Sequence, residues 1–505
     1  MKKSIIFFAL FLLYSCPLFS QGTNSAYYLI GYVQSIARSW DDKCILFSQG
    51  GHGIISQTDT NASTIYWTSQ LDYPGQNFFI HSIIQTSDSN FVALTSQIGP
   101  NSYFSAIKIT ETGALLWVKK YFDTVTNSAW DLAPTQDGGF ILVGGGCSGQ
   151  NFAIRCDTRG NIIWQNQYRD TLVYSGSAIN ICDAGNDEYY ISGTNSNYGI
   201  YADNIVFKID GTGNLIWFRK IVMDGPDWNG GIIASNDGGV TISGTTNVLD
   251  STVQSSYLAH FDSAGNNLWI KVYTDGSTVN HNYGLIQLDN DNYIGAGSVY
   301  YDDIRNVQMA NIKTDVNGNF ISAIAGSRFE DGRGHDNTFS VKNLSSSSFL
   351  VGGTSFSKLN SDGFGYCHSD IIYMPSITPT YTIESISPVT IHLNFISDTI
   401  TYTYNISPGM GPYLTCANAT DVQSIYTSDK NISVFPNPFE NSLKILVEDN
   451  LKSNVIIYDL ASKIILEQEF VNSVSLNMEK LARGLYLYEV RNSSGWFRTG
   501  KVVKD

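Results

Sequence analysis

The histidines, cysteines and acidic residues of this 505-residue chain are the first places to look for chemistry. Its seven histidines are scattered, with no His-Glu-x-x-His motif, and its seven cysteines include no Cys-x-x-Cys pair. There is no Gly-x-Ser-x-Gly elbow, no phosphate-binding loop and no Gly-x-Gly-x-x-Gly in a βαβ setting. Asp302 and Asp303 are adjacent, but neighbouring side chains on a strand point to opposite faces, which favours a solvated loop. We therefore assign no catalytic, cofactor-binding or metal-ligating residue.

A repeat of about fifty residues organises the middle of the chain. The run from Asp137 to Gly144 returns from Asp237 to Gly244, and weaker copies surround both. Their first apolar positions form a column with steps of 47, 49, 49, 51, 53 and 56 residues: Cys44, Phe91, Phe140, Tyr189, Val240, Tyr293 and Phe349. A second column keeps the same phase: Trp67, Trp117, Trp164, Trp217 and Trp269. Two columns in phase predict seven copies of one structural unit.

Each copy is predicted to form four short strands joined by tight turns. In the fifth copy these strands cover 231–235, 240–244, 257–262 and 267–273. In the Asp-Gly-Gly and Asp-x-x-Gly-Asn turns the Asp accepts hydrogen bonds from backbone amides and Gly takes a positive φ. Four strands in every fifty residues predict an all-β fold, a seven-bladed β-propeller, with a β-solenoid as the alternative. The last copy lacks a fourth strand, which residues 22–30 are in phase to supply, closing the ring.

Most repeated residues have a structural interpretation. We expect the Trp column to pack between blades and the repeated Asp residues to form turns. Cys44 and Cys156 fall in columns of apolar residues and are interpreted as buried packing residues. Calcium at the Asp315–Asn319 run is the alternative there, but no full EF-type loop follows.

The run from Thr135 to Gly145, followed by Cys156 to Trp164, resembles the Asp-Gly-Gly-Tyr repeat of secreted bacterial propeller-like proteins. The resemblance covers roughly Ala26 to Asp370. It implies a fold and no particular activity, because propellers host many unrelated functions.

The loops that differ from copy to copy are the candidate ligand site. They are expected to open on the face opposite the stereotyped turns, and variable loops on a rigid scaffold commonly carry function. The candidate ligand residues are Tyr198, Tyr201, Trp228, Tyr300, Tyr301, Arg305, Arg333 and His335.

The N-terminus predicts export. A short basic start precedes an apolar run from Ile5 to Leu13, the layout of a signal peptide over residues 1–20, and the run is too short to span a bilayer. Lipoprotein processing at Cys16 is the alternative, which the bulky Tyr14 disfavours. No later stretch reaches about 18 apolar residues, so we predict no transmembrane segment in the mature chain.

The amino-acid composition agrees with an all-β fold and restricts the possible partners. Charged residues are only 15% of the chain, whereas Gly (45), Tyr (30) and Phe (26) are abundant, which suits strands and turns. The formal net charge of −15 argues against nucleic acid as a partner, because that requires a basic footprint.

After the repeats, which we assign to residues 21–370, residues 371–426 have few charges and read as a β-rich connector. One alternating strand is expected over Thr399–Tyr404. Cys367 and Cys416 flank the connector and are our candidate disulfide.

The last segment, residues 427–505, is predicted to be a small Ig-like β-sandwich of seven short strands. These strands are 432–435, 443–447, 455–458, 463–467, 474–476, 485–490 and 500–504. The segment resembles the type A C-terminal sorting domain of type IX secretion. The matching residues include Pro436, Asn437, Pro438, Tyr458, Asp459, Gly484, Tyr486 and Lys501. One departure is Ala461-Ser462-Lys463, where the family usually has Gly before Lys.

This resemblance implies a Gram-negative cell, passage through the periplasm, recognition by the type IX secretion machinery and removal of the domain at export. For the rest of the chain we expect a secreted or surface-attached, non-catalytic binding protein whose ligand is a glycan or a protein. The alternative is a secreted carbohydrate-active hydrolase or lyase that uses carboxylates of the loop face.

Overall fold

The computed structural model describes residues 25–28, 32–39, 44–49, 54–59, 65–72, 78–97, 103–122, 127–147, 151–170, 175–196, 202–250, 253–274, 279–300, 307–327, 338–345, 348–353, 356–364, 368–372, 374–393, 396–399, 403–408, 413–417, 432–447, 452–459, 464–492 and 497–504. Their regular structure is all β-strand, as predicted, and none of them belongs to an apolar helix that could cross a membrane. The chain divides into two compact units, Met1–Asn418 and Ala419–Asp505. The predicted signal peptide lies outside the described residues.

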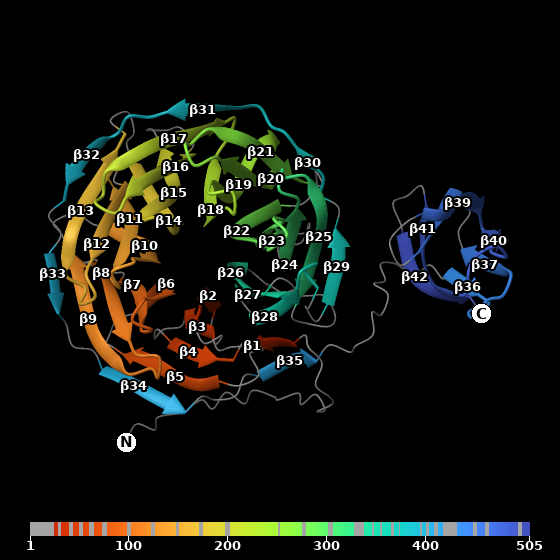
Figure 1. Cartoon of the computed structure of the whole chain (residues 1–505), viewed down its shortest axis with the longest axis horizontal. Helices are drawn as coiled ribbons and strands as arrows, with labels where there is room; N and C mark the ends of the chain where they lie inside the picture. Colours follow the sequence, from red (N-terminus) through yellow and green to blue (C-terminus); the bar gives the residue numbers. More distant parts are fainter. Residues whose placement is uncertain are drawn as a thin grey trace, which may run out of the picture. The chain divides into compact units, whose positions relative to one another are not determined.

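The first unit is built from antiparallel groups of consecutive strands, which we call blades and number in chain order (Figure 1). Blades one to three are β2 (Tyr32–Arg38), β3 (Cys44–Gln49), β4 (Ile54–Thr58), β5 (Ile65–Asp72); β6 (Phe78–Gln85), β7 (Phe91–Gln97), β8 (Tyr103–Ile109), β9 (Leu115–Phe122); and β10 (Asn127–Pro134), β11 (Phe140–Cys147), β12 (Asn151–Cys156), β13 (Ile162–Arg169). Blades four to six are β14 (Ser175–Gly185), β15 (Glu188–Ser196), β16 (Ala202–Asp210), β17 (Leu215–Met223); β18 (Asp227–Ala234), β19 (Val240–Asp250), β20 (Val253–Phe261), β21 (Asn267–Tyr273); and β22 (Val279–Gln287), β23 (Tyr293–Tyr300), β24 (Val307–Thr314), β25 (Phe320–Ser327).

The last blade is completed by the N-terminus. It holds β26 (Thr338–Ser345), β27 (Ser348–Gly353) and β28 (Phe356–Asn360), and its fourth strand is β1 (Ser25–Tyr28). Ala26 pairs with Ser357 and Tyr27 with Phe356 in antiparallel register. The segment that the sequence predicted would close the ring therefore does so.

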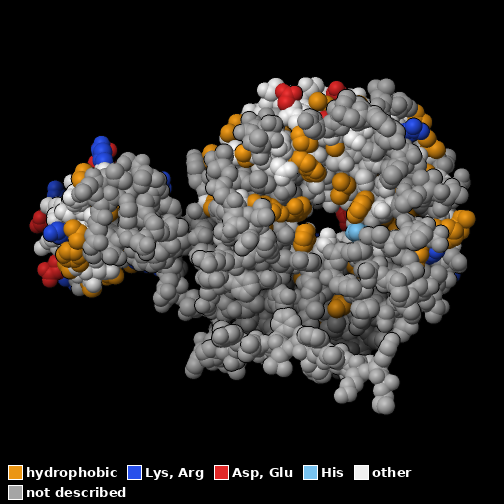
Figure 2. All heavy atoms as spheres, turned by 180° about the vertical axis from the view of Figure 1, so that it is seen from behind, with side chains coloured by type: hydrophobic (Ala, Val, Ile, Leu, Met, Phe, Trp, Pro, Cys, Tyr) orange, Lys and Arg blue, Asp and Glu red, His pale blue; other side chains and the backbone are white. Residues whose placement is uncertain are grey.

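The first strands of successive blades are neighbours all the way round, and β26 again lies beside β2. The inner strands thus form a closed ring, which is the predicted β-propeller arrangement (Figure 1). A hollow lies at the centre of the ring, with hydrophobic side chains, a histidine and an acidic side chain at its edge (Figure 2).

The segment after blade seven is more than a connector, because it adds an outermost strand to every blade. We call β29–β35 the belt. Its strands are β29 (His368–Ile372), β30 (Ser376–Ile377), β31 (Tyr381–Ser385), β32 (Val389–His392), β33 (Ile396–Thr399), β34 (Thr403–Pro408) and β35 (Tyr413–Ala417). They pair in turn with β25, β21, β17, β13, β9, β5 and β1, so the chain returns around the ring in reverse order.

The belt corrects one expectation. The single strand expected over Thr399–Tyr404 is instead the end of β33 and the start of β34, with residues 400–402 outside the described part. The alternating pattern is divided because β33 pairs with blade two and β34 with blade one.

The core follows the apolar columns. Phe91, Phe140, Tyr189, Val240 and Phe349 are at most 1% exposed. Cys156 is also buried, as expected for a packing residue, and burial raises the pKa of its thiol to about 12. The side chains of Cys44 and Cys416 and all of Cys367 lie outside the described residues, so the Cys367–Cys416 disulfide stays a prediction.

The second unit has the seven predicted strands in two sheets. One sheet contains β36 (Ile432–Phe435), β37 (Ser442–Val447) and β40 (Ser473–Asn477); the other contains β38 (Lys452–Tyr458), β39 (Ile464–Val471), β41 (Gly484–Asn492) and β42 (Phe497–Lys504). Apolar side chains that alternate along the strands, such as Leu443, Ile445 and Val447, are at most 2% exposed and meet in one core.

Candidate binding site

The tryptophan column joins each blade to the next. The indole N–H of Trp164 donates to the Gly211 carbonyl at 2.8 Å, and that of Trp217 donates to Ser263 at 3.1 Å. Glycines of the same turns lie against the rings: a Cβ added to Gly265 would be 2.6 Å from Trp217. The prediction that this column packs between blades is confirmed.

The repeated Asp residues are turn formers, as predicted. The Oδ1 atom of Asp157 accepts hydrogen bonds from the backbone N–H groups of Arg159 and Asn161, both at 2.8 Å. The same paired bonds recur at Asp210, Asp262 and Asp315.

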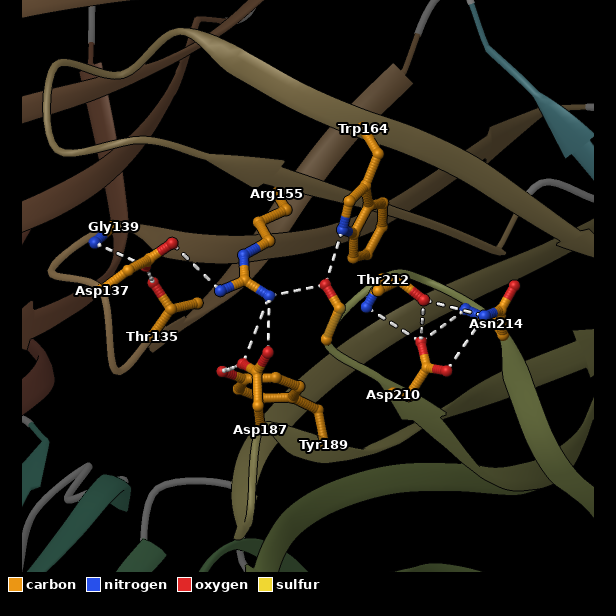
Figure 3. Close-up of polar contacts among 11 residues, drawn as sticks. Thr135, Asp137, Gly139, Arg155, Trp164, Asp187, Tyr189, Asp210, Thr212 and Asn214 are labelled. Atoms are coloured by element: carbon orange, nitrogen blue, oxygen red, sulfur yellow. Dashed lines mark hydrogen bonds and ion pairs between the residues drawn. The ribbon is translucent and has the colours of Figure 1, made fainter.

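A column of basic residues forms ion pairs with acidic residues in or next to the tight turns of the blades. Sequence reasoning missed this column. Arg155 Nη2 lies 3.1 Å from Asp137 Oδ2, and Arg155 Nη1 lies 2.9 Å from Asp187 Oδ2 in the next blade (Figure 3). Bonds from Thr135 and Gly139 and the charge of Arg155 outweigh burial and hold the pKa of Asp137 below its ordinary value. The other pairs are Lys108–Asp88, Lys208–Glu188, His260–Asp237 and Lys313–Asp362.

One of these pairs, together with a nearby hydroxyl, has the residue types and contacts of a catalytic triad. His260 Nε2 lies 3.0 Å from Asp237 Oδ2, and His260 Nδ1 lies 2.8 Å from the hydroxyl of Thr241. However, Thr241 is 0% exposed and the carboxylate is the outer member, so no substrate can reach the hydroxyl. Because Arg or Lys occupies the same slot in other blades, we interpret this chain of bonds as structural.

Only two of the sequence-predicted ligand residues lie in the described part of the chain. Trp228 is on β18 and 43% exposed, and Tyr300 ends β23 half-buried beside Tyr283. The other six lie outside the described residues: Tyr198, Tyr201, Tyr301, Arg305, Arg333 and His335.

A different column, missed in the sequence, lies on the first strands, which form the closed ring of the propeller. In each first strand other than β18 one residue is bulged out of register, ten positions before the apolar column. We call these residues the inner ring: Gln34, His81, Trp130, Ile179, Tyr283 and Phe339. In β18 the irregularity spans two residues, and Gly230, ten positions before Val240, contributes no side chain.

The inner ring is largely aromatic and partly open. The His81 and Trp130 rings meet edge to face at 4.9 Å between blades two and three, and the Tyr283 and Phe339 rings lie 6.0 Å apart between blades six and seven. Trp130 is 38% exposed. Hydrophobic side chains at the edge of the central hollow in Figure 2 agree with this composition.

Polar residues next to the inner ring tie the first strands together. Asp131 Oδ2 accepts a hydrogen bond from the Ile181 N–H of blade four at 3.0 Å, and Asp131 also bonds Ser82 of blade two. Burial raises the pKa of Asp131 to about 6, although these bonds oppose the rise. His81 Nε2 lies 2.5 Å from the Ser96 hydroxyl, and burial lowers the pKa of His81 to about 4.

Asn437, in the Pro-Asn-Pro run of the predicted sorting domain, is hydrogen-bonded to the last strand of the second unit. The Asn437 amide donates to the Lys501 carbonyl at 3.1 Å and accepts from the Val503 N–H at 2.8 Å. The Tyr486 hydroxyl donates to Ala482 at 2.8 Å, and Gly484 has a positive φ of 152°. Tyr458 ends β38, with Asp459 directly after it, so the matching residues lie at strand ends as well as in the core.

Residues 433–505 match the model of the family described as secretion system C-terminal sorting domain. The protein is therefore exported by type IX secretion and is secreted or attached to the cell surface. No curated protein sequence matches the chain.

Solved structures similar to this chain include the Dos1 propeller, with 14% identity, a TM-score of 0.42, and coverage of 68% of this chain and 97% of that one. The WD40 β-propeller domain of Doa1 has 13% identity, a TM-score of 0.41, and coverage of 67% and 97%. A protein of unknown function from Bacteroides caccae has 13% identity, a TM-score of 0.35, and coverage of 54% and 90%. These likenesses concern the fold alone.

Proposed function

We propose that this protein is a non-catalytic binding protein that acts outside the cell and takes a glycan or a protein as its ligand. The observation that supports this most is the inner ring, where aromatic side chains remain partly exposed at the centre of a closed scaffold. Aromatic anchors fixed by a rigid framework are a common basis of recognition.

The framework keeps these anchors in place. Each inner strand lies in a sheet, tryptophan–glycine contacts join the blades, and the belt covers their outer strands. A binding site that is already ordered loses little conformational entropy when a ligand arrives. Trp228 and Tyr300 extend the proposed site onto blades five and six, and the six ligand residues outside the described part stay within the proposal.

Two described carboxylates of blades four and five, Asp203 and Asp227, are poorly placed for acid–base catalysis. Asp227 is 0% exposed, so a substrate cannot reach it. Asp203 lies 2.9 Å from Lys220 Nζ, and its side chain is 15% exposed. Neither carboxylate has the open position that a general acid or base needs.

The test is retention of ligands by the mature chain, immobilised and offered soluble polysaccharides and unfolded proteins. We expect retention with no change in the length of the retained molecules. A Trp130→Ala variant should weaken retention, whereas Tyr66→Ala, which removes an exposed aromatic ring of the outer strand β5, should not. Shortened products would instead support the hydrolase or lyase.

A further inference from the structure

The inner ring carries no charged side chain in the described residues. Its members are aromatic or aliphatic apart from the amide of Gln34, and His81 is neutral at physiological pH because burial lowers its pKa to about 4. No Lys or Arg belongs to this column. The charges on the inner strands next to it include Asp131 and Lys342, which have opposite signs, and Lys342 acts to lower the pKa of Asp131. The whole chain is acidic, at −15. These features disfavour an anionic ligand.

The aromatic members form two walls. His81 and Trp130 belong to blades two and three, and Tyr283 and Phe339 to blades six and seven. Around the ring, blade one separates the two pairs on one side, and blades four and five separate them on the other. The two walls therefore lie on well-separated parts of the ring of first strands, and Gln34 belongs to blade one between them.

An extended peptide suits this place poorly. A peptide that adds to a sheet needs a free edge with regularly spaced backbone groups. The inner edges are interrupted by an irregularity in every first strand, and the belt pairs with the outer edges. The described first strands therefore offer no long regular edge to a peptide at the centre of the ring.

We propose that the inner ring binds an uncharged glycan chain, whose sugar rings lie between the two aromatic walls. The C–H face of a sugar ring is apolar and packs on an aromatic ring, while its hydroxyl groups can exchange hydrogen bonds with the Gln34 amide. This inference rests on the proposed function and specifies its ligand class.

The test is calorimetric titration of the mature chain with uncharged hexasaccharides of β-linked glucose, mannose and xylose, with oligogalacturonate as the charged probe and a mixture of unstructured peptides as the third class. We expect at least one uncharged hexasaccharide to bind. Trp130→Ala, and independently Phe339→Ala on the other wall, should weaken that binding about tenfold, the size of one aromatic contact. Tyr66→Ala is the matched control, and thermal unfolding checks that every variant is folded.

The outcomes separate the two claims. If oligogalacturonate or a peptide binds in a manner that depends on Trp130 and the uncharged sugars do not, the glycan class is wrong and the binding function stands. If an uncharged hexasaccharide binds but neither wall variant affects it, the inner ring is not its site. If the folded protein binds no probe of any class, the glycan proposal is overturned, and retention of longer polysaccharides or proteins then decides the binding function.

Discussion

Trp217 of blade four and Gly265 of blade five approach so closely that a Cβ added to the glycine would lie 2.6 Å from the indole ring. The same glycine has a φ of +79°, so two independent constraints meet at one residue. The contact recurs between other blades, for example between Trp67 and Gly113 at 2.8 Å. Glycines in the turns therefore allow the indole ring of one blade to pack closely against the next blade.

Gly265→Ala should destabilise the propeller because it adds a clash with Trp217 to the strain of a positive φ. We expect a loss of about 2–4 kcal/mol in the free energy of unfolding, measured by chemical denaturation. Gly238→Ala is the matched control, since its φ is +82° but an added Cβ would meet nothing within 4 Å. The control should cost only about 1–2 kcal/mol. Equal losses would show that the tryptophan contact does not restrict the turn.

The belt should stabilise the propeller, whereas the sorting unit should not. A chain ending at residue 367 lacks the belt and exposes the outer strands, so we expect a lower unfolding temperature and association into oligomers. A chain ending at Asn418 keeps β35 against β1 and should match the propeller transition of the full chain. Calorimetry and light scattering measure both. A monomer of unchanged stability ending at 367 would contradict the role of the belt.

The repeated features were predictable because residue type and spacing recur together. Phe140 and Trp164 each mark a column, and Asp157 and Gly160 identify a turn whose chemistry requires them. In the second unit, alternation such as Leu443, Ile445 and Val447 predicted the strands directly.

The inner ring and the belt escaped sequence reasoning for physical reasons. His81, Trp130 and Ile179 share a spacing of ten residues from the apolar column but no residue type, because a residue bulged out of the strand pairing is not restricted to one type by a repeated pairing partner. The belt has short strands with no repeat, since their backbones supply the pairing and their side chains are free to vary. The basic column that includes Arg155 could have been found by aligning the repeats, because Arg155 directly precedes the apolar column position Cys156.

Removal of residues 427–505 should leave the protein in the periplasm, because these residues include the match to the sorting family. Cell fractionation and immunoblotting measure the outcome. Normal export of the chain without residues 427–505 would refute the assignment.

Asn437→Ala removes two hydrogen bonds to the last strand and should lower the free energy of unfolding of the sorting unit by about 1–3 kcal/mol.

Asp227 should make the propeller less stable as the pH rises toward 8. Burial raises its pKa to about 7; the Thr246 hydroxyl opposes this rise and the charge of Asp203 adds to it. A carboxyl that binds its proton more tightly when folded stabilises the fold below its unfolded pKa of about 3.9, and this stabilisation is lost as the pH rises through 7. At about 1.4 kcal/mol per pH unit, the loss amounts to a few kcal/mol.

Asp227→Asn removes this ionisation, so the variant should gain stability relative to the wild type at pH 8 and differ little at pH 5, as measured by chemical denaturation. Asp224→Asn, which changes an exposed carboxyl three residues earlier, is the control and should follow the wild type at both values. Asp131, with its pKa of about 6, also loses stabilising free energy as the pH rises, and this loss is common to the wild type and both variants. If the Asp227→Asn variant loses as much stability between pH 5 and pH 8 as the wild type, Asp227 is not the group responsible.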